Sequence, residues 1–192
     1  MASSQELSPT ILPAVGSLLR LQYAVWMEND PAAVARRIID ASQYMVLATA
    51  DEGGGPWASP VWFAMSGYME FFWVSSPGAT HSRNIALRPE VGIVIFDSRA
   101  PIGGGQGVYM TAEAKAVTGL EIDRGIGVFS RRSVAEGGRG WTPDDVRGDA
   151  PIRLYLAAAS THSILAKDGK PDHRIMVDIR GMAPTAAQGG SR

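Results

Sequence analysis

A series of short apolar segments, each as long as a strand and separated by turn residues, most constrains the fold of this chain. The segments at 44–50 (YMVLATA), 91–96 (VGIVIF) and 108–117 (VYMTAEAKAV) are apolar, β-branched or alternating, as strands usually are. With 22 glycines and 12 prolines among 192 residues, turns are frequent. This pattern favours a strand-rich fold over a helical bundle.

Further strands are predicted at 57–65, 68–74, 152–158, 162–166 and 174–179. Ser66-Gly67 is predicted to join 57–65 and 68–74 as a hairpin. Pro60 indicates an edge, a bulge or a strand end. Strands joined by hairpins form an antiparallel sheet, and about six to eight of them can close as a barrel.

Helices are predicted at 13–27, from Pro31 to about Ala41, at 80–87 and at 121–132. Asp30 is the candidate N-cap of the second of these helices, and Pro31 suits its first turn. Residues 98–107 are predicted to form a Gly-rich loop, and 133–150 are polar without periodicity. We therefore expect a partly helical extension over 1–30, one domain over 31–180 and a disordered tail over 181–192.

Composition narrows the function. The net charge is −1, which argues against a nucleic-acid partner. The chain has no cysteine, and its three histidines are far apart in sequence, so no metal site is predicted. No apolar run is long enough to span a membrane, and residues 1–10 do not resemble a signal peptide. The expected location is the cytoplasm.

The Gly-rich stretch at 102–107 does not fit a dinucleotide-binding fingerprint, because Val108 stands where its third glycine belongs. The segment at 75–91 is more informative. A strand ends in hydroxyl residues, and a helix begins near Thr80. The start of a helix offers free backbone N–H groups, Thr80 and Ser82 add hydroxyls, and Arg83 adds a bidentate cation. Together these groups suit a phosphate monoester, although a capped surface helix with an exposed arginine explains them equally well.

The same segment resembles a known family. Ser82-Arg83-Asn84-Ile85-Ala86-Leu87-Arg88-Pro89-Glu90-Val91, preceded by the strand at 57–63 (WASPVWF), is similar to the pattern of the pyridoxamine 5′-phosphate oxidase-like, FMN-binding split-barrel superfamily. The resemblance covers about residues 33–180. It implies a mainly β fold with flanking helices, an antiparallel split β-barrel of the FMN-binding type.

The resemblance also implies the cofactor site. The implied FMN-binding residues are Ser59, Pro60, Val61, Trp62, Ser75, Thr80, His81, Ser82, Arg83, Asn84 and Gln106. Alternation along the second strand puts Ser59, Val61 and Phe63 on one face and Trp62 on the other. No catalytic acid or base is identified, which suits chemistry that a flavin carries out itself.

Two departures place the chain in the divergent branch of this superfamily. The segment 57–65 has no Lys or Arg, and there is no C-terminal Arg-Leu-x-x-Arg pair, unlike true pyridoxamine phosphate oxidases. The expected function is an FMN-dependent oxidoreductase acting on a small molecule. An F420-dependent reductase and a non-catalytic flavin or haem carrier remain alternatives.

The resemblance further implies a homodimer with the cofactor at the subunit interface. The apolar residues of 68–74 point to both faces of that strand. One face is expected to fill the barrel, and the short helix at 80–87 or a second subunit is expected to cover the other.

Overall fold

The computed structural model describes residues 30–167 and 170–180, so the helix predicted at 13–27 and the tail predicted at 181–192 lie outside the described residues. The strands are β1 (Tyr44–Ala50), β2 (Pro56–Trp62), β3 (Ala64–Ser66), β4 (Glu70–Ser75), β5 (Glu90–Phe96), β6 (Gly107–Ala116), β7 (Arg153–Leu165) and β8 (Arg174–Met176). The helices are α2 (Pro31–Ala41), α3 (Thr80–Leu87), α4 (Glu121–Ala135) and the short 3-10 helix η1 (Pro143–Asp145).

All pairings in the sheet are antiparallel, in the order β2-β1-β5-β6-β7-β4-β3, with β8 added on β7. The two end strands, β2 and β3, follow each other in the chain, so the sheet curls into a half-barrel. Along the described chain β2 pairs only with β1, while β4 pairs with β7 and β3. We call the unpaired boundary between β2 and β4 the split. Because β2 is an end strand, it tolerates Pro60, as predicted.

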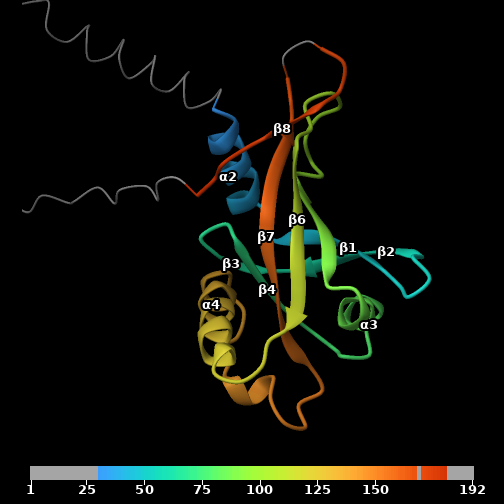
Figure 1. The fold of residues 1–192 in the computed structure, drawn as a ribbon. Coiled ribbons are helices and arrows are strands. Elements are labelled where there is room, and N and C mark those ends of the chain that lie inside the picture. The colour runs from blue at the N-terminus through green and yellow to red at the C-terminus, as the bar shows by residue number, and fades with distance from the viewer. Residues whose placement is uncertain (1–29, 168–169, 181–192) are drawn as a thin grey trace, which may run out of the picture.

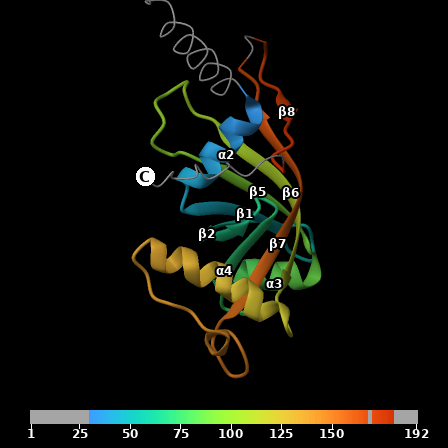
Figure 2. The same ribbon diagram turned by 90° about the vertical axis from the view of Figure 1, so that its left-hand side faces the viewer.

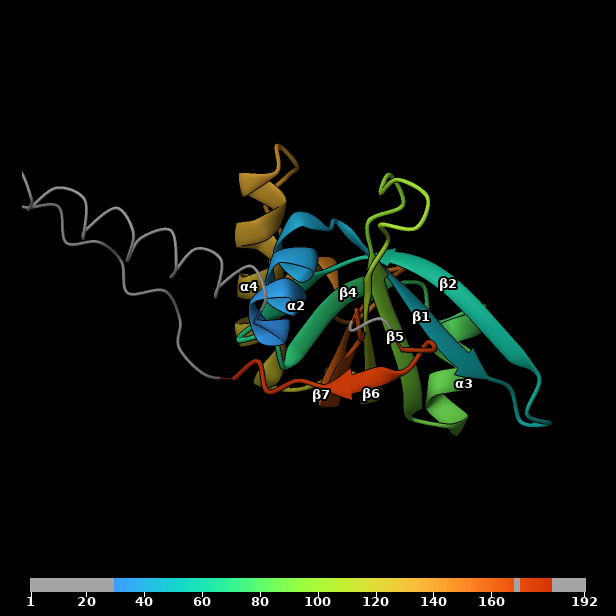
Figure 3. The same ribbon diagram turned by 90° about the horizontal axis from the view of Figure 1, so that it is seen from above.

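Two apolar cores lie on opposite faces of the sheet. The larger core joins the strands to Ile39 of α2 and Ile85 of α3. The second core packs Phe72 and Leu154 against Ile126 and Phe129 of α4. Helices α3 and α4 accordingly stand on opposite sides of the molecule (Figures 1 and 3). No helix of the described segments is long and apolar enough to cross a membrane.

Local sequence signals explain several boundaries. Asp30 caps α2, with its carboxylate accepting from the N–H groups of Ala32 and Ala33. The helix α3 has the predicted limits and is followed by Pro89. The turn between β3 and β4 has positive φ at both Gly67 and Tyr68, as a type I′ turn requires. Tyr68 therefore belongs to the turn and not to the strand in which it was predicted.

Three other predictions were wrong in detail. The two strands predicted at 152–158 and 162–166 form one strand, β7, because the hydroxyls of Ser160 and Thr161 bond to Thr111 across a register shift instead of ending the strand. The helix α4 continues three residues beyond its predicted end at Arg132. The final strand, β8, stops at Met176 instead of continuing to 179.

The outer face of β4 is covered by α4 and not by the short helix at 80–87. The rings of Phe71 and Trp73 face the larger core, while Phe72 packs on α4. Figure 2 shows α4 in front of the sheet, with the loop towards β7 below it. Both apolar faces of β4 are therefore buried within one chain, so β4 by itself does not require a partner subunit, contrary to the expectation from its sequence.

Candidate functional site

Helix α3 places a group of polar side chains at one end of the split. Its N-cap residue, Ala79, makes no side-chain capping bond, and the first N–H groups of an α-helix have no partner within the helix. The guanidinium of Arg83 folds back over this turn and donates to the carbonyl of Gly78 and, at 3.4 Å, to Oγ1 of Thr80. No carboxylate of the described chain pairs with Arg83. A cation beside uncapped N–H groups is a suitable place for an anion.

His81 bridges the split. Its Nδ1 lies 3.2 Å from Oγ of Ser59 on β2, and its Nε2 lies 2.9 Å from Oγ of Ser75 at the end of β4. The indole N–H of Trp57 also donates to Ser59, at 2.9 Å. Ser59 can therefore donate to Nδ1 while Nε2–H donates to Ser75, which fits a neutral imidazole.

The burial of His81 also favours its neutral form. The side chain of His81 is buried, and desolvation lowers its pKa below the ordinary histidine value. Because His81 is then neutral at neutral pH, Arg83 is the cation of this site. We call Ser59, Ser75, Thr80, His81 and Arg83 the α3 cluster.

The neighbours of Arg83 on α3 are buried. Ser82 is buried, and its Oγ has no hydrogen-bond partner within the described structure. An unpartnered buried hydroxyl is costly, and this one lies one turn or less from the start of α3. Asn84 donates from Nδ2 to Oγ1 of Thr49 on β1, at 3.0 Å. This bond fixes α3 on the sheet, so in this structure the amide of Asn84 is engaged inside the protein.

The predicted alternation of β2 is confirmed. Val61 packs on the larger core and Trp62 packs on the second core, so the two side chains leave opposite faces. The ring of Trp62 meets Phe129 edge to face at 4.9 Å, and its Nε1–H donates to Glu136 at 3.1 Å. Trp62 therefore does not join the α3 cluster, and Pro60 points to its side of the strand.

Gln106 is also separate from the α3 cluster. It precedes Gly107, which pairs with Phe96 at the far end of β5 from α3. The strand β5 has seven residues, so Gln106 lies about 20 Å along the sheet from the start of β5, which follows α3. Its side chain donates to the carbonyl of Leu165, at 3.3 Å.

Sequence analysis missed two tryptophans. Trp57 was placed in the second strand but not in the site, and its indole N–H extends the bridge from Ser59 to His81. Trp141 lies in the stretch 133–150, in which the sequence showed no periodicity. The signal that could have located it is Thr142-Pro143-Asp144-Asp145, a capping-box pattern with proline at the first position.

A curled antiparallel half-barrel with three helices and a bridged split defines the class of split-barrel proteins. A family model described as pyridoxamine 5′-phosphate oxidase matches residues 32–161. The chain belongs to this family, in a branch distant from the true oxidases.

Solved structures with the same fold include proteins that differ in cofactor. The haem storage protein HutZ from Vibrio cholerae is 18% identical, with a TM-score of 0.53 over 65% of this chain and 87% of that chain. A haem-binding protein from Mycobacterium smegmatis is 19% identical, with a TM-score of 0.60 over 77% of this chain but only 58% of that chain. An F420 reductase is 17% identical, with a TM-score of 0.50 over 67% of this chain and 95% of that chain. These likenesses establish the fold alone, and no curated protein sequence matches significantly.

Proposed function

We propose that this chain binds FMN and acts as an FMN-dependent oxidoreductase on a small-molecule substrate. The observation that carries the proposal is the uncapped start of α3 with Arg83 folded over it. A phosphate monoester carries negative charge and several acceptor oxygens. The N–H groups of the first turn, the hydroxyl of Thr80 and the guanidinium of Arg83 supply matching donors.

Each part of the α3 cluster would have a separate task. Arg83 and the first turn of α3 would hold the phosphate. His81 would keep Ser59 and Ser75 in place on the two sides of the split. Bound FMN would supply the redox chemistry through its isoalloxazine ring, while the protein binds and orients it.

We also propose that the chain is a homodimer whose cofactor lies at the interface. The position of Gln106 supports this proposal, because a residue expected at the cofactor stands at the start of β6, with β5 and β1 between it and Ser59 of its own chain. A second copy could bring its Gln106 to that cluster. The exposed aromatic ring of Trp57 on β2 is available for such a contact.

Titration of FMN into the cofactor-free protein tests the role of Arg83. Removing a charge-assisted contact costs about 1.5–3 kcal/mol, so Arg83→Ala should weaken FMN binding roughly tenfold to hundredfold. Arg88→Ala is the matched control. Arg88 follows the same helix at its other end, where it donates to the carbonyl of Glu52. Equal FMN affinities for the two variants would remove Arg83 from the phosphate site.

The same titration with F420 and with haem distinguishes the cofactors. Each of the three compounds has its own absorption spectrum, so binding is read directly from the spectral change. Tight binding of haem or F420, together with no detectable binding of FMN, would reject FMN as the cofactor.

A further inference from the structure

A cavity lies on the α4 side of the sheet, away from the α3 cluster. It has a volume of about 400 Å³, within the range of small-molecule pockets. Its aromatic walls are Tyr44, Trp62, Phe129 and Trp141. Phe129 meets Trp62 at 4.9 Å and Trp141 at 5.3 Å, both edge to face. The three rings form a continuous aromatic wall.

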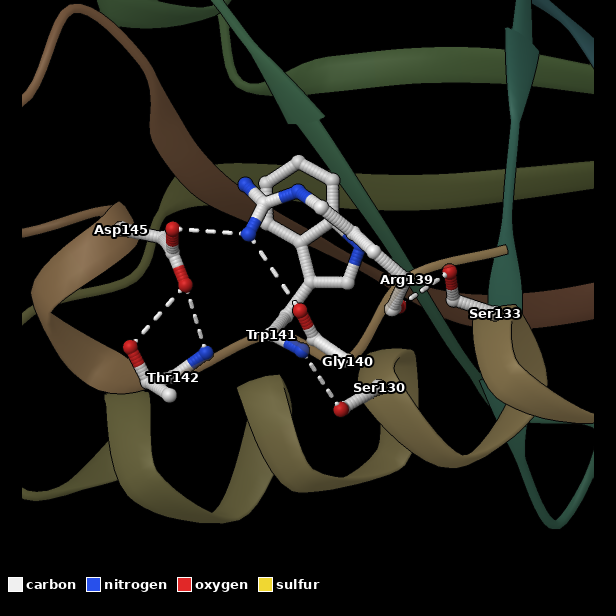
Figure 4. Close-up of polar contacts among 7 residues, drawn as sticks. All are labelled: Ser130, Ser133, Arg139, Gly140, Trp141, Thr142 and Asp145. Atoms are coloured by element: carbon white, nitrogen blue, oxygen red, sulfur yellow. Dashed lines mark hydrogen bonds and ion pairs between the residues drawn. The ribbon is translucent and has the colours of Figure 1, made fainter.

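The loop after α4 holds Trp141 in place (Figure 4). The backbone N–H of Trp141 donates to Oγ of Ser130 at 2.8 Å. The guanidinium of Arg139 covers the Trp141 ring at 3.7 Å. Arg139 is held in turn by Asp145 at 2.9 Å. Ser133 donates to the carbonyl of Arg139, also at 2.8 Å. A wall fixed before a ligand arrives reduces the entropy cost of binding.

The charges around this cavity are already paired. Glu136 accepts from the indole of Trp62 through one carboxylate oxygen and pairs with Arg132 at 2.8 Å through the other. The charge of Arg139 is likewise compensated by Asp145. Since these carboxylates and guanidinium groups are all paired with one another, the cavity offers aromatic surface but no unpaired charge for a charged ligand.

We propose that this cavity binds a neutral, planar aromatic ring, at a site separate from the one proposed for FMN. Two lining residues connect the cavity with the α3 cluster. Trp62 follows Val61 on β2, and Val74 precedes Ser75 on β4. The cavity and the α3 cluster therefore use opposite faces of the same two strands at the split.

Menadione, a neutral planar naphthoquinone, is the probe. The chain contains no cysteine, so this quinone has no thiol to alkylate, and binding is read without that side reaction. The five tryptophans each give an indole N–H signal in a nitrogen–proton correlation spectrum, assigned by Trp→Phe variants. We expect saturable shifts at Trp62 and Trp141. Trp57, on the other face of β2, should remain unshifted.

Calorimetric titration of the same probe gives the energetic test. Trp141→Ala should weaken menadione binding roughly tenfold, and Trp141→Phe should weaken it less, because a ring remains. Neither variant should alter FMN affinity, whereas Arg83→Ala should alter FMN affinity and leave menadione affinity unchanged. If menadione binds as expected and FMN does not, the cavity stands and the proposed function fails.

Three results would overturn the proposal. They are the absence of saturable menadione binding, equal affinity in the wild type and Trp141→Ala, and shifts at Trp57 instead of Trp62 and Trp141. Shifts of the Trp62 and Trp141 signals with protein concentration alone would show that the face is an interface between copies, which also rejects it as a ligand pocket.

Discussion

His81 ties the two sides of the split together while remaining uncharged. Burial lowers the pKa of His81 and also that of His162, whose Nε2 lies 2.9 Å from the carbonyl of Tyr68. Unfolded histidines titrate near pH 6.5, so below that pH the unfolded chain binds more protons than the folded chain. The stability contribution of both groups is thus complete above about pH 6.5 and is lost as the pH falls towards the lowered values.

Chemical unfolding at several pH values should therefore show a free energy of unfolding that declines from pH 7.5 to pH 5.5. His81→Gln replaces the imidazole of the bridge with an amide that does not titrate, so the decline in this variant should be shallower than that of the wild type. His162→Gln should remove the contribution of His162 to the same decline in the free energy of unfolding. An unchanged decline in the double variant would assign the acid sensitivity to carboxylates instead.

Single residues also show where sequence analysis is reliable. Asp30 and Pro31 locate the start of α2 because capping is a local effect. The roles of Trp62 and Trp141 depend on α4, which is distant from Trp62 in the chain, so local periodicity could not reveal their contact with Phe129. Gln106 was grouped with the α3 cluster by resemblance, and only the register of β5 and β6 separates the two.

At the scale of elements, α4 packs closely on the sheet at Gly125. A Cβ built there would lie 2.8 Å from Cε1 of Phe72 and 2.9 Å from Cδ2 of Leu154. Both of these side chains are fully buried, so neither can move aside easily. The second core therefore requires a glycine at this position.

We expect Gly125→Ala to destabilise the protein by about 1–2 kcal/mol, because overpacking costs about 1–3 kcal/mol and alanine returns up to about 1 kcal/mol of helix propensity. Gly127→Ala is the control on the same helix. Its Cβ would meet only the end of the flexible Arg131 side chain, at 3.6 Å, so it should be neutral or stabilising. Denaturant midpoints measure both changes, and a neutral Gly125→Ala would contradict the close packing.

Strand β7 shows why element boundaries can mislead. Ala159-Ser160-Thr161 has the composition of a turn, yet the strand continues because its neighbours supply partners for these hydroxyls. The helix α3, in contrast, was predicted to the residue, since Pro89 follows immediately after it. A local signal such as Pro89 predicts where a helix ends. The sequence does not show when tertiary contacts carry a strand through a weak turn signal.

At the scale of the whole molecule, the proposed dimer can be tested by measuring its mass in solution. Light scattering at micromolar protein should give about twice the chain mass of 20.4 kDa. If the cofactor site is shared, replacing Gln106 with Ala should weaken FMN binding although Gln106 is remote from the α3 cluster of its own chain. A monomer that binds FMN with unchanged affinity would contradict both the dimer and the shared site.

The position of β7 also governs the order in which the polypeptide can assemble. Strands β2, β1, β5 and β6 form one hydrogen-bonded group and β3 and β4 another, and β7 is the strand that pairs with both β6 and β4. Its residues 153–158 reach the ribosome exit about 80 residues after their partners in β4. Until β7 has been synthesised, the nascent chain carries two unjoined sheets with open edges, and open edges favour aggregation. Closure of the barrel is therefore a late, long-range event, and the slow step of folding should be the docking of β7 between the two finished halves.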